Sequence, residues 1–240
     1  SFDKKAQILD SSNLSIELNS INYKNLKKQK FIISILPLVV QENLKIQLNR
    51  KKLSEIKDFL LIHKTLSKAD QKFIETLAFK YKVNTANKHK IDNINRLLTI
   101  VDEIPNSIVL AQAANESGWG KSRFAKEYNA LFGEYTFDIY NGIVPAERKE
   151  GEKHLIKFFP TIDKSIESYF INLNTHLAYK NFRMERQRLR INNLNLDPWT
   201  LVKYLKPYAQ DKNYVKNIEL IIKDNNLIKF DNITTIVTKS

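Results

Sequence analysis

The chain has 240 residues, of which 42% are hydrophobic and 27% are charged, so it can bury a core and has the composition of a globular protein. Its formal net charge of +13 comes mostly from scattered lysines, which favours a polyanionic partner but does not indicate a nucleic-acid-binding tract. Because cysteine is absent, disulfides, thiolate catalysis and cysteine-type zinc sites are excluded.

Residues 1–25 are polar and aperiodic, and we expect a loose lead-in there. The longest apolar run, Phe31 to Val40, is too short to span a bilayer and predicts a core helix. Pro37 predicts a break or kink in that helix, and a second helix is expected from Leu53 to Leu60. The start of the chain lacks a basic-then-apolar signal, so we expect that any signal peptide has already been removed.

The rest of the N-terminal region also has helical patterns. Ser67 to Asp70 resembles a capping box before a helix from Phe73 to Tyr81. The stretch Ile94 to Val101 predicts another amphipathic helix. Residues 26–103 are therefore expected to form an all-helical region that packs on a catalytic domain.

The pattern changes after Pro105, which suits the first turn of a helix that ends at Glu116. All five glycines lie between Gly118 and Gly151, so irregular backbone is concentrated there. Asn141-Gly142 predicts a hairpin turn, and the alternation from His154 to Phe159 predicts a short β-element.

Helical periodicity returns from Asp163 to Leu177. Asp197-Pro198 is typical of a helix start that leads to Leu201 and Tyr208, and a last helix is expected from about Asp211. Residues 227–240 are expected to form a tail or a short strand. Helices around one small glycine-bearing β-lobe predict a predominantly helical α+β fold with a cleft at their junction.

The stretch Gln112-Ala113-Ala114-Asn115-Glu116-Ser117-Gly118-Trp119-Gly120 places a carboxylate where a helix stops. Partial negative charge at the carbonyl end of a helix disfavours ionisation of Glu116. Cover by Trp119 would desolvate it further. Both effects predict a raised pKa for Glu116, as a general acid working near neutral pH requires.

Residues 111–120 read AQAANESGWG, and residues 129–133 read NALFG. These two motifs resemble those of the family 73 glycoside hydrolases, which are bacterial β-N-acetylglucosaminidases with a lysozyme-like fold. The resemblance covers residues 104–224 and is greatest to the Bax-type subgroup, where it extends through residues 165–176 and upstream to about Lys30. Ala130 departs from the second asparagine that many members have.

The resemblance implies a catalytic domain at residues 104–226 with Glu116 as its general acid. The implied reaction is hydrolysis of the β-1,4 bond between N-acetylglucosamine and N-acetylmuramic acid in peptidoglycan, by an endo-type enzyme of the periplasm or cell envelope. The implied partners are glycan strands, with no nucleic acid and no transmembrane segment.

A second carboxylate usually takes part in glycoside hydrolysis, as nucleophile or as base for water. The family places it in the β-lobe, where Glu147, Glu150 and Glu152 are candidates and Glu150 is our choice. Glu134 is a further candidate. The N-acetyl group of the substrate is an alternative that would make the second carboxylate less essential.

Substrate contacts are expected from polar and aromatic side chains beside the two motifs and near the C-terminal cleft edge. The residues are Gln112, Trp119, Asn129, Phe132, Tyr135 and Tyr208. Packing is an alternative for each aromatic ring, and it is favoured for Tyr214. The four histidines lack metal-ligand spacing, and no metal or cofactor is implied; His176 is expected to be a hydrogen-bonded structural residue.

Two other functions compete with hydrolysis. A lytic transglycosylase of the same fold needs one glutamate and forms an anhydro product. An inactive wall-binding or scaffold module would act through the basic surface alone.

Overall fold

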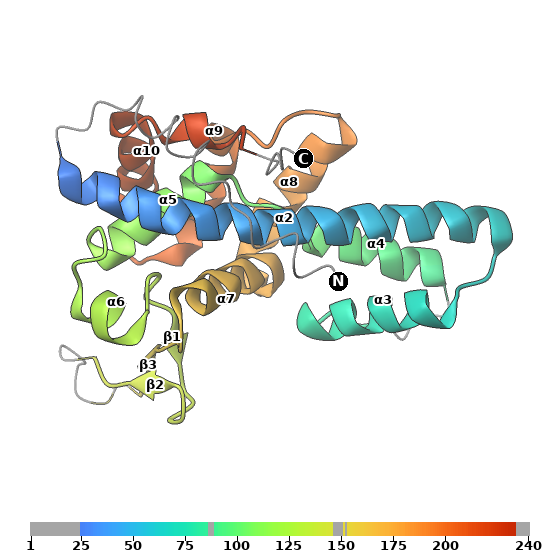
Figure 1. The fold of residues 1–240 in the computed structure, drawn as a ribbon, viewed down its shortest axis with the longest axis horizontal. Coiled ribbons are helices and arrows are strands. Elements are labelled where there is room, and N and C mark those ends of the chain that lie inside the picture. The colour runs from blue at the N-terminus through green and yellow to red at the C-terminus, as the bar shows by residue number, and fades with distance from the viewer. Residues whose placement is uncertain (1–24, 86–88, 146–150, 152, 234–240) are drawn as a thin grey trace, which may run out of the picture. The chain divides into compact units, whose positions relative to one another are not determined.

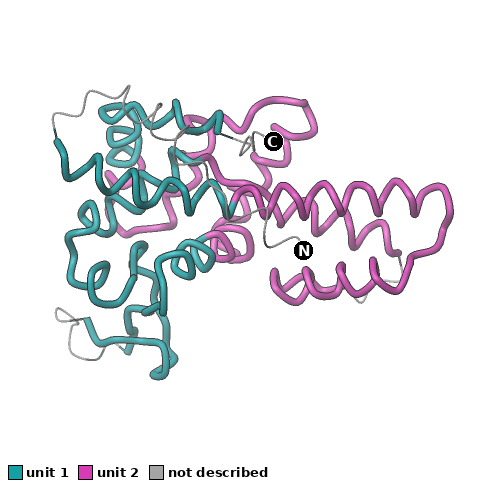
Figure 2. The backbone as a smooth tube through the Cα atoms, viewed as in Figure 1, with its two compact units in different colours: residues 1–42, 106–169, 216–240 teal, residues 43–105, 170–215 magenta. Residues whose placement is uncertain are grey.

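The computed structural model describes residues 25–85, 89–145, 151 and 153–233. These residues form a predominantly helical α+β fold with one small sheet, which confirms the predicted class (Figure 1). The chain divides into two compact units, each assembled from distant parts of the sequence (Figure 2). Unit 1 contains residues 1–42, 106–169 and 216–240, and unit 2 contains residues 43–105 and 170–215.

The N-terminal helix α2, Leu26–His63, is one uninterrupted element of 38 residues, so the prediction of two helices was wrong. Pro37 lies inside it, and no glycine or further proline follows before His63 to end the helix. By length and composition α2 could cross a membrane, but half of its apolar window is buried inside the protein. Ile32, Leu36 and Val39 are completely buried, as expected for a core helix.

In unit 2, helices α3, Lys68–Lys80, and α4, Lys90–Ile100, confirm the two predicted helices. Ser67 caps α3 as expected, because its Oγ accepts a hydrogen bond of 3.0 Å from the backbone N of Asp70.

A buried ionic cluster centred on Asp102 holds unit 2 together. Asp102 pairs with Arg50 at 3.2 Å, with Arg190 at 2.9 Å and with the completely buried Arg186 at 3.6 Å. Two of these arginines come from helix α8, Lys180–Ile191, which the sequence did not predict. Arg186 also donates to backbone carbonyls after the end of α4, including that of Glu103 at 3.0 Å. The cluster therefore fixes α8 against the C-terminal end of α4.

In unit 1, helix α5, Asn106–Ser117, is held at its N-terminus by the C-terminal segment. Asp231 accepts hydrogen bonds from the backbone N of Ser107 at 2.7 Å and from its hydroxyl at 2.6 Å. This carboxylate complements the positive end of the helix dipole. It follows a 3₁₀ turn, η3, Leu227–Phe230, and the rest of the expected tail or strand lies outside the described residues after Ile233.

The small sheet of unit 1 contains three short strands in the order β1-β3-β2. They are β1, Tyr135–Thr136, β2, Gly142–Ile143, and β3, Leu155–Lys157, and β3 confirms the predicted β-element. The predicted Asn141-Gly142 hairpin is wrong, because β1 and β2 each pair with β3 rather than with one another. Gly142 is needed for close approach instead, since a Cβ there would lie 2.6 Å from the side chain of Leu155.

Among the last helices, the predicted end of the helix from Asp163 to Leu177 is wrong, and the predicted start of a helix at Asp197-Pro198 is confirmed. Helix α7, Ile162–Thr175, ends before Leu177, which begins the 3₁₀ turn η1, Leu177–Tyr179, and is 78% exposed. Asp197 caps α9, Pro198–Leu201, as predicted. The remaining elements are α6, Arg123–Tyr128, η2, Val202–Tyr208, and α10, Tyr214–Asp224.

Candidate active site

The sequence at the end of α5 stops the helix abruptly just after Glu116. Gly118, Trp119 and Gly120 all have positive φ, at +56°, +60° and +74°. Ser117 locks this turn, because its Oγ donates to the carbonyl of Ala113 at 2.5 Å and accepts from the backbone N of Gly120 at 2.8 Å. Glu116 is thereby fixed in the last turn of α5, half-buried, at the carbonyl end that the sequence predicts.

The second motif lies against Glu116. Oε2 of Glu116 is 3.7 Å from the position that a Cβ would take on Gly133, whose φ is +61°. Oε1 of Glu116 accepts a hydrogen bond of 3.1 Å from Nδ2 of Asn115. The two motifs therefore meet at the carboxylate that the family resemblance identifies as the general acid.

Hydrogen bonds to neighbouring segments hold the second motif in place. Asn129 adopts a left-handed conformation at the end of α6 and donates to the carbonyls of Phe159 and Pro160 at 3.0 and 3.2 Å. The backbone N of Leu131 donates to Oγ of Ser165 at 3.2 Å. Asn129 thus supports the loop in the structure, whereas the sequence predicts a substrate contact.

Gln112 and Phe132 lie in the core, where the structure differs from the predicted substrate contacts. Gln112 is completely buried and accepts a hydrogen bond from the hydroxyl of Tyr169, and Phe132 is 1% exposed. The rings of Phe132 and Tyr169 stack at 4.1 Å. One tyrosine of α7 therefore joins both motifs, and these two side chains position the site from behind.

Trp119 is half-buried and packs against the first turns of α2. The ring of Phe31 meets it edge-on at 5.6 Å, and Nζ of Lys28 lies 4.7 Å from its centroid. Tyr135, in contrast, is 66% exposed at the start of the sheet. Phe137 and Tyr140, which no sequence motif marks as substrate contacts, are 78% and 86% exposed on the same lobe. The ring of Tyr135 packs against that of His154, with centroids 4.4 Å apart, and all three rings present exposed surface on which a sugar can stack.

Tyr208 belongs to unit 2, whereas Glu116 belongs to unit 1. Its ring stacks on Tyr214 at 5.5 Å, and the ring of Tyr179 lies 6.2 Å away. Tyr214 is only 3% exposed, in line with its predicted packing role. His176 is structural, as expected, because its Nδ1 accepts from the backbone N of Ala178 at 3.2 Å.

The expected second carboxylate, Glu150, lies outside the described residues, as do Glu147 and Glu152. The described acid nearest in sequence to the second motif is Glu134. Its Oε2 accepts a hydrogen bond of 2.9 Å from Ser168, whose Oγ in turn accepts one of 2.8 Å from Nζ of Lys157. Burial raises the pKa of Glu134, although Ser168 and Lys157 act in the opposite direction.

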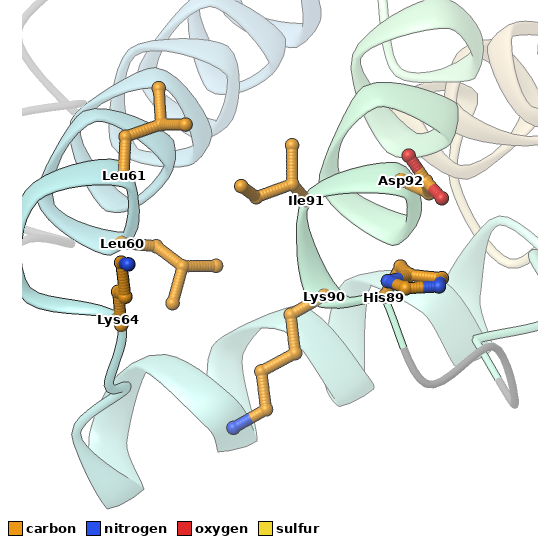
Figure 3. A pocket seen from close by; sticks show the side chains of 7 residues that line it. All are labelled: Leu60, Leu61, Lys64, His89, Lys90, Ile91 and Asp92. Atoms are coloured by element: carbon orange, nitrogen blue, oxygen red, sulfur yellow. The ribbon is translucent and has the colours of Figure 1, made fainter.

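A pocket of about 700 Å³ lies within unit 2, between the end of α2 and the start of α4 (Figure 3). Leu60, Leu61 and Lys64 line one side of it, and His89, Lys90, Ile91 and Asp92 line the other. With a single carboxylate and no part of either motif, this pocket lacks the paired acids that glycoside hydrolysis usually employs.

The chain is similar to a family model, to a curated protein and to a solved structure. A family model for glucosaminidases, described as mannosyl-glycoprotein endo-beta-N-acetylglucosaminidase, matches residues 94–227. Protein bax of Escherichia coli (strain K12) is 30% identical over 204 residues, which cover 83% of this chain and 70% of that protein. The catalytic domain of the autolysin Auto from Listeria monocytogenes matches with a TM-score of 0.48 at 17% identity, over 93% of this chain and 98% of that one.

Proposed function

Since the chain belongs to the glucosaminidase family of glycoside hydrolases, we propose that it cleaves peptidoglycan between N-acetylglucosamine and N-acetylmuramic acid. The observation that carries this proposal is the contact between the two motifs at Glu116. A half-buried carboxylate at the end of α5, against the Gly133 loop, is placed where a general acid of this family is expected.

In the proposed mechanism Glu116 protonates the oxygen that leaves C1 of N-acetylglucosamine. The glycosidic bond breaks, and water supplies the hydroxyl that C1 gains, so the product has a reducing N-acetylglucosamine end. An acidic group or the substrate N-acetyl group stabilises the positive charge that develops on the sugar ring.

We keep Glu150 as the proposed second carboxylate, and the surroundings of Glu134 support that choice. A group on the opposite face of the sugar must be ionised to attack the ring, to activate water or to stabilise positive charge. One carboxylate oxygen of Glu134 is buried and the other accepts a hydrogen bond from Ser168, so this carboxylate is already engaged inside the β-lobe. Glu134 is therefore better suited to hold the β-lobe to α7 through Ser168 than to supply the second charge.

The exposed rings of Tyr135, Phe137 and Tyr140 are proposed to bind the glycan strand by stacking. The substrate in turn implies that the protein acts in the cell envelope after export. No metal is part of the proposal, and the described residues contain no group of three or more histidine or acidic side chains placed to hold one.

Mass spectrometry of purified peptidoglycan digested with the protein tests the proposal. Fragments with reducing N-acetylglucosamine ends, convertible by borohydride, are the expected products. If 1,6-anhydromuramic acid ends formed instead, the protein would be a lytic transglycosylase. Binding without any release of fragments would identify a wall-binding module.

A further inference from the structure

A basic pocket of about 450 Å³ lies entirely within unit 1, on the side of the Glu116 turn that faces α2. We call it the lysine pocket. Its walls come from the first turns of α2, the turn after Glu116, and α6. The residues that characterise it are Lys27, Lys30, Phe31, Trp119, Lys121 and Lys126.

All the charged side chains that line the lysine pocket are positive. Lys27, Lys30, Lys121 and Lys126 line it, and no aspartate or glutamate is among its lining residues. Within the part of the chain that the structure describes, none of these four ammonium groups forms an ion pair. Four like charges around one hollow repel one another, and an anion bound among them would relieve that repulsion.

The aromatic wall of the pocket is rigid. Trp119 is held between Phe31 and Lys28, and Nζ of Lys28 is itself fixed by a 3.2 Å hydrogen bond to Oδ1 of Asn225. A Cβ on Gly120 would lie 3.2 Å from the ring of Phe31, so glycine permits this close packing. The pocket therefore offers packed apolar surface beside exposed cationic groups, which suits a short chain that carries both carboxylates and small apolar side chains.

The lysine pocket is also tied to the candidate active site. Trp119, Gly120 and Lys121 follow Glu116 by three to five residues, in the turn that Ser117 locks. A fully extended chain spans at most about 3.6 Å per residue, so Trp119 lies within roughly 11 Å of Glu116 from Cα to Cα. A group attached to a glycan at Glu116 can therefore reach the pocket.

We propose that the lysine pocket binds the carboxylates of the peptide stem carried by the glycan that is being cleaved. This inference rests on the proposed function, because it takes peptidoglycan as the substrate. A volume of about 450 Å³ is within the range of small-ligand sites of about 300–1,000 Å³. An open hollow of this size has room for one short peptide, whereas a duplex or a membrane surface would contact a broader basic face.

Calorimetric titration of the full chain tests this binding. The probes are the soluble stem tetrapeptide released from peptidoglycan by an amidase and the same peptide with its carboxylates amidated. We expect the free peptide to bind, and the double variant Lys30→Gln/Lys121→Gln to bind it about five- to tenfold more weakly, as loss of two exposed charge contacts implies. Amidation should weaken binding to the unmodified chain by at least as much.

The matched control is Lys72→Gln/Lys203→Gln, which removes the same charge from exposed positions outside the pocket. It should bind the free peptide as the unmodified chain does. A second pair, Lys27→Gln/Lys126→Gln, repeats the test if the first variant unfolds at a lower temperature. Equal losses in the pocket and control variants, no binding of the free peptide, or tighter binding of a glycerol phosphate oligomer would each overturn the proposal.

A second substrate distinguishes failure of the proposed hydrolase function from failure of the proposed peptide site. Glycan strands stripped of their peptides contain the scissile bond but lack the stem. If the unmodified protein binds the free peptide in the pocket yet releases no reducing ends from either intact peptidoglycan or these strands, the hydrolase proposal fails and the peptide site stands. If it cleaves bare strands but does not bind the free peptide, the peptide site fails and the hydrolase proposal stands.

Discussion

Oε2 of Glu116 lies 3.7 Å from the point where Gly133 would carry a Cβ, so the two sequence motifs meet at the carboxylate. Gly133→Ala places a methyl group at that point, in ordinary van der Waals contact with Glu116. The φ of +61° also strains any L residue, and we expect a loss of about 1–2 kcal/mol in the free energy of unfolding. Urea unfolding and peptidoglycan turnover are the two measurements.

Gly118→Ala is the matched control, because Gly118 has a φ of +56° and nothing within 4 Å of its Cβ position. Both variants should lose similar stability. Only Gly133→Ala should change turnover beyond what its stability explains. Equal turnover in the two variants would mean that the Gly133 loop does not restrict Glu116.

Glu116→Gln keeps the shape of the side chain and removes its transferable proton. We expect turnover to fall by at least about 100-fold, since general acid catalysis contributes about 10²–10⁴-fold. Binding to peptidoglycan and the thermal unfolding temperature should stay unchanged. Glu127→Gln, an exposed acid on α6, should keep normal turnover. A Glu116→Gln enzyme with near-normal turnover would reject the assigned role.

Glu150→Gln tests the second carboxylate. If Glu150 positions water or stabilises the sugar cation, turnover should fall by two or more orders of magnitude, roughly 3 kcal/mol in the barrier. If the substrate N-acetyl group attacks C1, the loss should be much smaller. Glu147→Gln and Glu152→Gln serve as neighbouring controls. Normal turnover in all three would remove this segment from the mechanism and leave Glu134 as the remaining candidate.

Glu134→Gln should act on stability more than on turnover. Because burial raises the pKa of Glu134, the folded chain binds more protons than the unfolded chain above the ordinary glutamate pKa of about 4.3. The contribution of Glu134 to stability therefore decreases as pH rises through that window. Urea unfolding at pH 4 and pH 7 should show that the variant gains stability relative to the unmodified protein at the higher pH. A constant difference at both pH values would contradict the raised pKa.

How much of this structure the sequence predicts depends on whether the determining contact is local. Ser67 and Asp197 cap their helices through residues three positions ahead, and both caps were predicted correctly. The continuation of α2 past Pro37 depends on burial of its later turns, for example at Ile46 and Leu53, and was missed.

In the candidate active site, too, features set by local contacts were predicted and features set by long-range contacts were not. Glu116 and the turn that stops α5 are local features of one motif, and they were predicted. The core positions of Gln112 and Phe132 depend on Tyr169, which lies 57 and 37 residues further along the chain. Without knowledge of the contact with Tyr169, the sequence around Gln112 and Phe132 is equally compatible with a core position and with a substrate contact.

The last prediction concerns Asp102, which helps to hold α8 against the end of α4. Asp102→Asn leaves Arg50, Arg186 and Arg190 without their shared charge, and breaking a buried ion pair typically costs about 3–5 kcal/mol. Asp92→Asn, at an exposed position of α4, should change the free energy of unfolding by less than about 0.5 kcal/mol. Chemical denaturation at pH 7 compares the two. A loss below about 1 kcal/mol for Asp102→Asn would show that the cluster is not what stabilises unit 2.

The pH dependence of the same variant gives an independent check. Burial alone would raise the pKa of Asp102, but Arg186, Arg50 and Arg190 outweigh it and hold that pKa below its usual value. The unfolded chain then binds the proton at a higher pH than the folded chain does. The stabilisation from Asp102 is therefore complete above the unfolded pKa of about 3.9 and is lost as pH falls through the folded pKa. Acid unfolding followed by circular dichroism should show this loss in the unmodified protein, and the stability gap to Asp102→Asn should narrow below pH 4. If the difference in stability between the two proteins stayed constant below pH 4, folding would not change the pKa of Asp102.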